Sequence, residues 1–132
     1  MELCDLLLSR GVGIEAGLLT TEDALAFVRS GLAGRCQRVL IEPLDEDAHV
    51  AVQHAANMEE IVVSAGITLP QVHHGYGMAC WAVNQRGLER GYGIRTGLED
   101  VTLLPDGKQA RDNAELVAAA AYLIRTHVGL GQ

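Results

Sequence analysis

The sequence predicts an α/β protein in which parallel strands alternate with helices. Short apolar runs and amphipathic segments follow one another four times along the 132 residues, and glycines stand at the boundaries between them. Nearly half of the residues are hydrophobic, and no linker or low-complexity tract divides the chain. We therefore expect one domain with its own hydrophobic core, spanning residues 1–132.

Each of the four units has a recognisable strand and helix. The predicted strands are the apolar runs at 12–15, 36–42, 69–74 and 92–98. Thr20 begins the first helix, with Asp23 three residues later as a variant of the capping box, and Gly31 or Gly34 ends it. The second helix begins at residue 45 or 46 and has apolar residues at three- and four-residue spacing up to Gly66. The third follows the turn at 75–77 and reaches residue 91, and the last spans roughly 113–127.

Composition excludes several classes of function. The net charge of −7 argues against general nucleic-acid binding, because the phosphate backbone attracts basic surfaces. No apolar run reaches the roughly 18 residues of a membrane helix, and Glu2 and Asp5 rule out a signal peptide at the start. The three cysteines lack zinc-finger spacing and indicate reduced thiols. A cytoplasmic protein is expected.

Ionisable residues stand where each predicted strand ends. They are Glu15, Glu42, the pair His73 and His74, and the pair Glu99 and Asp100. Parallel strands bring their carboxyl ends to one edge of the sheet, which carries the active site in α/β proteins. Carboxylates and imidazoles are the groups that ligate metals and move protons. The pattern favours a site at this edge, although strand ends are also simply exposed and often charged.

The segment 92–100 is the most informative stretch of the chain. It places Arg95, Glu99 and Asp100 in and just after a predicted strand, where charge is costly unless it is paired or bound to metal. Strand alternation predicts that Arg95 and Glu99 share a face, while Asp100 points elsewhere unless the strand turns. A guanidinium beside a carboxylate favours its ionised form. Both a functional site and a structural ion pair fit these residues.

Several motifs in this order resemble those of the β-keto acid cleavage enzymes, which include the 3-keto-5-aminohexanoate cleavage enzyme. The motifs are GVGIEAGL at 11–18, His-Gly at 74–75, RTGLED at 95–100, LPDG at 104–107 and NAELV at 113–117. The resemblance implies a (β/α)8 barrel that uses a divalent metal, usually zinc, and acetyl-CoA. A β-keto acid would exchange its fragment with acetyl-CoA and give acetoacetate and a new CoA thioester.

The resemblance also implies roles for particular residues. Glu99 would be the metal-ligating carboxylate, and Asp100 the general base with Arg95 as its partner. Glu15 would line the substrate pocket. His74 is similar to a family position near the site but receives no role, and neither does Glu42.

The chain departs from the family pattern in length and in ligands. It matches the C-terminal half of a family member, which implies a (β/α)4 half-barrel with two open strand edges. The family's His-x-His metal ligands are missing, and one glutamate does not complete a zinc site. We therefore expect a homo-oligomer or pairing with an N-terminal half. A non-catalytic half-barrel that serves assembly or binding is the alternative, and an α/β ligand-binding protein with an incidental likeness is a third reading.

Overall fold

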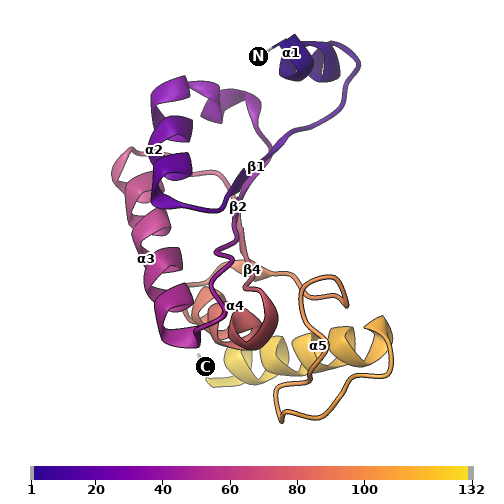
Figure 1. Cartoon of the computed structure of the whole chain (residues 1–132). Coiled ribbons are helices and arrows are strands. Elements are labelled where there is room, and N and C mark those ends of the chain that lie inside the picture. The colour runs from indigo at the N-terminus through magenta and orange to yellow at the C-terminus, as the bar shows by residue number, and fades with distance from the viewer. Residues whose placement is uncertain (1, 131–132) are drawn as a thin grey trace.

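The computed structural model describes residues 2–130, and the side chains of residues 2–128. Four parallel strands lie in the order β1-β2-β3-β4, and helices connect them (Figure 1). The strands are β1 (Glu15–Leu18), β2 (Arg38–Ile41), β3 (Gln71–His73) and β4 (Gly93–Ile94). The helices are α1 (Glu2–Ser9), α2 (Thr21–Ser30), α3 (Ala48–Ser64), α4 (Cys80–Glu89) and α5 (Asn113–Leu130), with 3-10 turns η1 (Leu32–Arg35) and η2 (Gly77–Ala79). The predicted α/β class is confirmed, and the arrangement is consistent with half of a (β/α)8 barrel.

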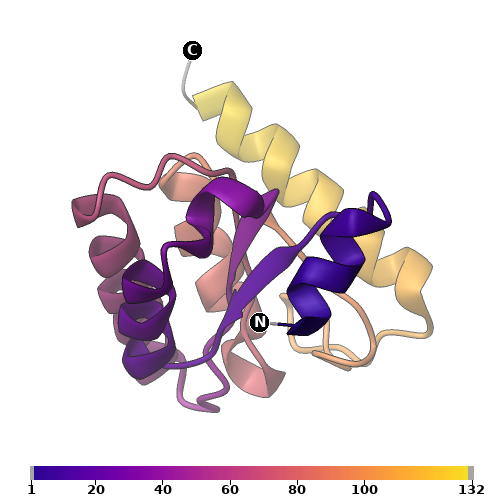
Figure 2. The same ribbon diagram turned by 90° about the horizontal axis from the view of Figure 1, so that it is seen from above.

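The two faces of the sheet have different surroundings. One face packs against α2 and α3, which lie side by side to the left of the strands in Figure 1. This face supplies alternate strand residues to the main core, among them Leu18, Val39 and Ile41. Figure 2 shows the same division from above, with α1 and α5 to the right of the strands. The alternate residues of each strand point to the opposite face, away from α2 and α3. Glu42, His74 and Arg95, which follow β2, β3 and β4, lie on that face.

The starts of two helices follow directly from capping chemistry. Thr20 accepts a hydrogen bond from the backbone N–H of Asp23, and the Asp23 carboxylate accepts from the N–H of Thr20, which confirms the predicted capping box. Asp47 caps α3 by accepting from the N–H of Val50. Gly31, in the left-handed conformation at φ 69°, ends α2 as the sequence predicts.

The first strand lies later in the chain than the sequence predicts. The prediction placed it at 12–15 with Glu15 at its end, whereas β1 begins at Glu15. Helix α1, which the sequence reading did not identify, ends just before Gly11, and that glycine adopts a left-handed φ of 73°. Residues 12–14 therefore connect α1 to β1 and are not part of a strand. Ladder pairing starts with Glu15 opposite Arg38, at the amino end of the sheet.

The fourth strand is shorter than predicted. The sequence reading extended it over 92–98, but the ladder ends at Ile94 apart from one bond from the N–H of Arg95 to the carbonyl of His73. The chain then turns, and the N–H of Leu98 donates to the side chain of Asn113 at the start of α5. Alternation therefore does not extend to Glu99 and Asp100.

The outer edges of β1 and β4 pair with no other strand among residues 2–130. Helix α1 has no buried residue, and its Leu3 and Leu6 are exposed. In the described part of the chain, no helix has both the length and the hydropathy needed to cross a membrane.

Candidate active site at the carboxyl edge

Three polar side chains follow the ends of three neighbouring strands. Glu42 follows β2, His74 follows β3 and Arg95 follows β4. Each continues the ladder by one bond: the N–H of Glu42 donates to Leu18, and that of His74 donates to Ile41. Alternation places all three on the face away from α2 and α3. The parallel sheet therefore gathers them at its carboxyl edge.

Asp100 joins this group because the chain turns back after β4. The N–H of Asp100 donates to the carbonyl of Gly97 at 2.9 Å, and its own carbonyl accepts from Gly77 at 2.7 Å. The carboxylate then receives two hydrogen bonds from Arg95, Nε to Oδ2 at 3.2 Å and Nη2 to Oδ1 at 3.1 Å. Bidentate pairing fixes the plane of the carboxylate. The hydrogen bond to Asp100 raises the pKa of Arg95, so the guanidinium stays charged.

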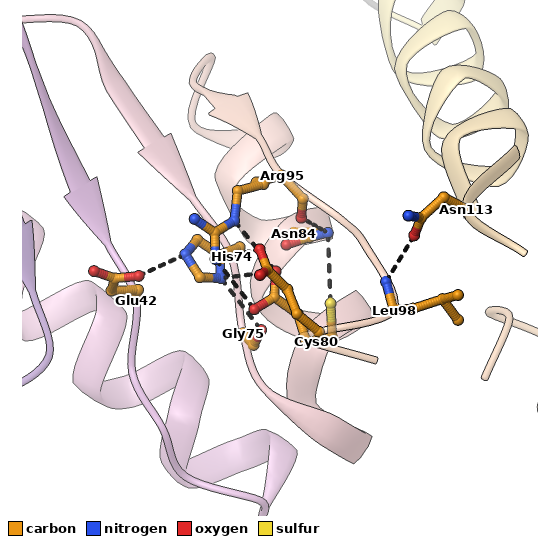
Figure 3. Close-up of polar contacts among 10 residues, drawn as sticks. Glu42, His74, Gly75, Cys80, Asn84, Arg95, Leu98 and Asn113 are labelled. Carbon is orange, nitrogen blue, oxygen red and sulfur yellow. Dashed lines mark hydrogen bonds and ion pairs between the residues drawn. The ribbon is translucent and has the colours of Figure 1, made fainter. Parts of the chain in front are cut away.

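His74 links Asp100 to Glu42. Its Nε2 lies 2.8 Å from Glu42 Oε2, and its Nδ1 lies 3.7 Å from Asp100 Oδ2 and 3.4 Å from the carbonyl of Gly75 (Figure 3). The side chain of His74 is 5% exposed, compared with 10% for Asp100 and 20% for Glu42. The four residues Glu42, His74, Arg95 and Asp100 form an alternating line of acid and base, which we call the edge cluster.

Residues of helix α4 contact the edge cluster and the backbone at the end of β4. Asn84 is fully buried and donates to the carbonyl of Arg95 at 2.9 Å, which holds the backbone where β4 ends (Figure 3). Cys80 is also buried, and burial, followed by the charge of Asp100, raises the pKa of its thiol to about 11. The thiol therefore stays protonated at neutral pH and is not a nucleophile there.

Glu99 contacts the edge cluster only through Arg95 among the described residues. Its side chain is 76% exposed, and its Oε1 is 3.6 Å from Arg95 Nη2. Glu99 and Asp100 both line an open pocket of about 350 Å³, together with residues of η2 and of the segment after the turn. The pocket therefore adjoins Glu99, which is exposed, and Asp100, whose side chain is 10% exposed.

The structure brings together two of the four residues that the resemblance assigned to the site. Arg95 and Asp100 form a direct pair, and Glu99 is adjacent but points into solvent. The expectation that Arg95 shares a strand face with Glu99 is wrong, because the strand ends first and the turn presents Asp100 to it instead.

Glu15 stands at the other end of the sheet. It pairs with Arg38, the first residue of β2. Glu42 comes four residues after Arg38, just past the end of β2, and so lies about 13 Å away at the usual strand rise of about 3.3 Å per residue. The expectation that Glu15 ends a strand at the carboxyl edge is therefore wrong. Its role in substrate binding remains a prediction to which this position gives no support.

Two members of the edge cluster had no role in the sequence reading. Glu42 and His74 were visible as ionisable residues at strand ends, but nothing linked residues 32 positions apart. The available signal was alternation in two adjacent parallel strands, which places both on one face. Alternation also separates His74 from His73, whose ring turns toward α4.

A three-ligand metal site does not form from this part of the chain. No group of three His, Cys, Asp or Glu side chains among residues 2–130 is arranged to hold a metal ion. Catalytic zinc sites use three protein ligands, so Glu99 would need ligands from elsewhere.

Fold and site together define an α/β protein with an acid-base cluster at the carboxyl edge of a parallel sheet. The family model for the beta-keto acid cleavage enzyme matches residues 48–129, more than half of the chain. The chain therefore belongs to the beta-keto acid cleavage enzyme family. The match includes His74, Arg95, Glu99 and Asp100, and it begins after Glu15 and Glu42. No curated protein matched the chain.

Proposed function

We propose that the chain takes part in the cleavage of a β-keto acid with acetyl-CoA, and that Asp100 is the general base. The observation that carries this proposal is the bidentate contact between Arg95 and Asp100 beside an open pocket. The two hydrogen bonds from Arg95 fix the plane of the Asp100 carboxylate, and a carboxylate within reach of a substrate can accept a proton.

The proton would come from the carbon between the keto group and the carboxylate of the β-keto acid. Asp100 takes the proton, and the C–H electron pair moves onto the keto oxygen as an enolate. Arg95 is positioned to retain a positive charge close to Asp100 during this transfer. The complete exchange balances, since a β-keto acid and acetyl-CoA give acetoacetate and the CoA thioester of the remaining fragment.

A divalent metal, zinc in the first instance, belongs to the same proposal. When bound, such an ion polarises a carbonyl and stabilises enolate charge. Glu99 is the candidate ligand in this chain because it is exposed and lines the same pocket as Asp100. The described residues do not complete such a site, so the remaining ligands would come from another chain or segment.

Partner binding is the second part of the proposal. The unpaired outer edges of β1 and β4 favour closure by a second copy or by a separate N-terminal half. A two-fold axis parallel to the strands would let each β4 pair with the partner's β1 and keep all strands parallel. Light scattering on a gel-filtration column measures this directly, and a stable monomer would contradict it.

The test of the base uses isotope exchange between labelled acetyl-CoA and acetoacetate. This exchange does not depend on knowing the natural β-keto acid. Asp100→Asn is expected to lower the exchange rate at least roughly 100-fold, in the range of general base catalysis. The matched control is Asp106→Asn, which changes an exposed aspartate in the nearby turn. Equal exchange in wild type and Asp100→Asn would remove Asp100 as the base.

The metal is tested separately by elemental analysis. Wild-type protein is expected to hold a chelator-sensitive divalent metal, and Glu99→Gln is expected to lose it. The incomplete ligand set favours one alternative, a non-catalytic half-barrel that serves assembly or binding. A folded protein that holds no metal and catalyses no exchange would support that alternative.

A further inference from the structure

We propose that His74, held by Glu42, is a positioning residue for Asp100, and that its ring donates from both nitrogens to oxygen acceptors. In this arrangement Oδ1 of Asp100 is the oxygen that receives the substrate proton. The assignment of Oδ1 as proton acceptor rests on the proposed function of Asp100, whereas the hydrogen bonding of the His74 ring does not depend on it.

The neighbours of the His74 ring determine its proton count. Nε2 faces Glu42 Oε2 at 2.8 Å, and Nδ1 faces the Gly75 carbonyl at 3.4 Å and Asp100 Oδ2 at 3.7 Å. All three neighbours are oxygen atoms that accept hydrogen bonds. A neutral imidazole has one N–H and one lone pair, so either tautomer would direct a lone pair at an oxygen acceptor. The doubly protonated ring avoids this conflict.

Burial makes the conflict costly. The side chain of His74 is 5% exposed, so water has little access to satisfy a misplaced lone pair. The charges in the edge cluster also balance in this state. Glu42 and Asp100 supply two negative charges, while Arg95 and a protonated His74 supply two positive ones. His73, the adjacent histidine, lies on the other face and remains uncharged at neutral pH because burial lowers its pKa to about 4.

The two oxygens of Asp100 then differ. Oδ2 lies between Arg95 Nε and His74 Nδ1, whereas Oδ1 receives only Arg95 Nη2 among the contacts of the described residues. The less occupied oxygen has a free lone pair for the substrate. A cation on each side of Oδ2 leaves Oδ1 as the acceptor of the proton.

Glu42 is bonded through one oxygen, and Gly17 leaves room for the other. Oε2 bonds to His74, and Oε1 lies 2.5 Å from where a β-carbon on Gly17 would stand. The glycine of β1 therefore leaves the space that Glu42 occupies. Glu42 acts on Asp100 only through His74, since the structure shows no direct contact between the two carboxylates in the described residues.

The proton count of His74 is measured by long-range ¹H–¹⁵N spectra of the labelled protein at pH 7. We expect both ring nitrogens of His74 to show the signature of protonated nitrogen. In Glu42→Gln, Nε2 is expected to lose its proton, because the glutamine amide can donate to it, while Nδ1 keeps its proton toward the Gly75 carbonyl and Asp100. An unprotonated nitrogen in wild-type His74 would overturn the proposal, and an unchanged doubly protonated ring in Glu42→Gln would remove Glu42 from it.

The spectra are assigned by the loss of signals in His74→Gln. If that variant does not fold, the four other histidines are replaced one at a time, and the signal of His74 is identified by elimination. The matched control is the pair of His54 and Asp45, whose Nδ1 and Oδ2 atoms are 2.7 Å apart. His54 is 48% exposed and lies outside the edge cluster, so Asp45→Asn should leave the His74 signals unchanged.

Exchange kinetics test the positioning of Asp100. Glu42→Gln and His74→Gln are expected to lower kcat between roughly 10-fold and 100-fold with little change in KM, because a small misplacement of a catalytic group costs this much. His54→Gln should match wild type. If Asp100→Asn abolishes exchange while both edge variants keep the wild-type kcat, the inference fails and the proposed function stands. If wild type shows no exchange, the proposed function fails, and the spectra still decide the arrangement of His74.

Discussion

Two adjacent histidines, one in β3 and one just after it, lie at two different groups of charged residues. His74 lies in the edge cluster at the carboxyl end of the strands. His73 is fully buried toward α4, close to a second group that we call the buried cluster, made of Glu59, Arg86, Arg90 and Tyr92. The two clusters lie at opposite ends of β4, since Tyr92 precedes this short strand and Arg95 follows it.

The buried cluster holds Glu59 by ion pairs and hydrogen bonds from its own members. Glu59, with 3% of its side chain exposed, receives Arg90 Nε at 2.9 Å and the Tyr92 hydroxyl at 3.0 Å on Oε1, and Oε2 lies 2.6 Å from Arg86 Nη2. Burial alone would raise the pKa of Glu59, but hydrogen bonds from Arg90 and Arg86 outweigh it and lower the pKa. Both oxygens of Glu59 contact cationic partners, although Oε2 and Arg86 Nη1 have no hydrogen bond among the described residues.

The edge cluster differs because one of its members, Arg95, is partly exposed and because a pocket adjoins Asp100. Asp100 lines that pocket, Glu99 is exposed beside it, and Arg95 is 40% exposed. Similar charged residues therefore join α3 to α4 in one region and lie beside an open pocket in the other. Both clusters contain paired charges, and they differ in the exposure of their members and in the pocket beside one of them.

Replacement of Glu59, the acid at the centre of the buried cluster, should give the largest difference in stability between variants of the two clusters. Glu59→Gln leaves Arg86 and Arg90 without a counter-charge at a buried position, and we expect it to lower the free energy of unfolding by about 3 kcal/mol. This figure is at the low end for a broken buried pair because Arg90 is 56% exposed. Urea denaturation measures the loss.

Two control variants bound that result. Glu60→Gln changes the exposed neighbour in the same helix and should have almost no effect on stability. Asp100→Asn should cost about 1 kcal/mol, because its partner Arg95 is partly solvated. A larger loss of stability in Asp100→Asn than in Glu59→Gln would contradict the distinction between a structural and a functional cluster.

His73 should make stability depend on pH in a defined window. Its ring stacks on Tyr92 with centroids 4.8 Å apart, and its Nε2 lies 2.9 Å from Gln71 Oε1. Burial lowers its pKa from 6.5 to about 4. The unfolded chain therefore binds a proton that the folded protein excludes, and stability falls as the pH drops from 6.5 toward 4. The loss amounts to roughly 3 kcal/mol.

Unfolding at a series of pH values checks this dependence. His73→Gln should have a flatter curve than wild type between pH 6.5 and 4. The contribution of Glu59 lies in a lower window, because a lowered acid pKa stabilises the fold above 4.5 and is lost as pH falls further. Parallel curves for wild type and His73→Gln would show that His73 titrates equally in both states.

The fold was predictable because apolar periodicity and capping are local signals. The box of Thr20 and Asp23 and the helix that follows it are encoded within a few residues. The boundaries of the outer strands were not, because they depend on ladder pairing with distant segments. Glu15 sits in an apolar run that looks complete at that residue, and only pairing with Arg38 shows that the strand starts there.

The site was predictable only in part, for a similar reason. Arg95 and Asp100 lie five residues apart, and their types alone suggested a pair. Their bidentate contact depends on the turn that Asn113 and Gly77 hold in place, and both contacts come from other elements. The contacts from Glu42 through His74 to Asp100 join segments that follow β2, β3 and β4. Predicting them requires the order of the strands in the sheet, which only the structure provides.

Alanine variants of Gly17 and Gly75 should distinguish a loss of stability from a change in the position of Glu42. A β-carbon on Gly75 would lie 2.8 Å from the carbonyl oxygen and 3.0 Å from the carbonyl carbon of Ala79, and 2.9 Å from the α-carbon of Cys80. Backbone cannot yield easily, so Gly75→Ala should cost about 2 kcal/mol. A β-carbon on Gly17 would meet only the end of the Glu42 side chain, which can rotate away.

Gly17→Ala should therefore change stability by less than about 1 kcal/mol, because alanine suits the strand at least as well as glycine. It should nevertheless displace the Glu42 carboxylate from His74 and remove the proton from Nε2, which the ¹⁵N spectra would record. Urea denaturation and the histidine spectra of the two alanine variants together make the measurement. If Gly17→Ala keeps the wild-type His74 signals, the space that this glycine leaves does not govern the position of Glu42. The edge cluster would then depend on the strand ends alone.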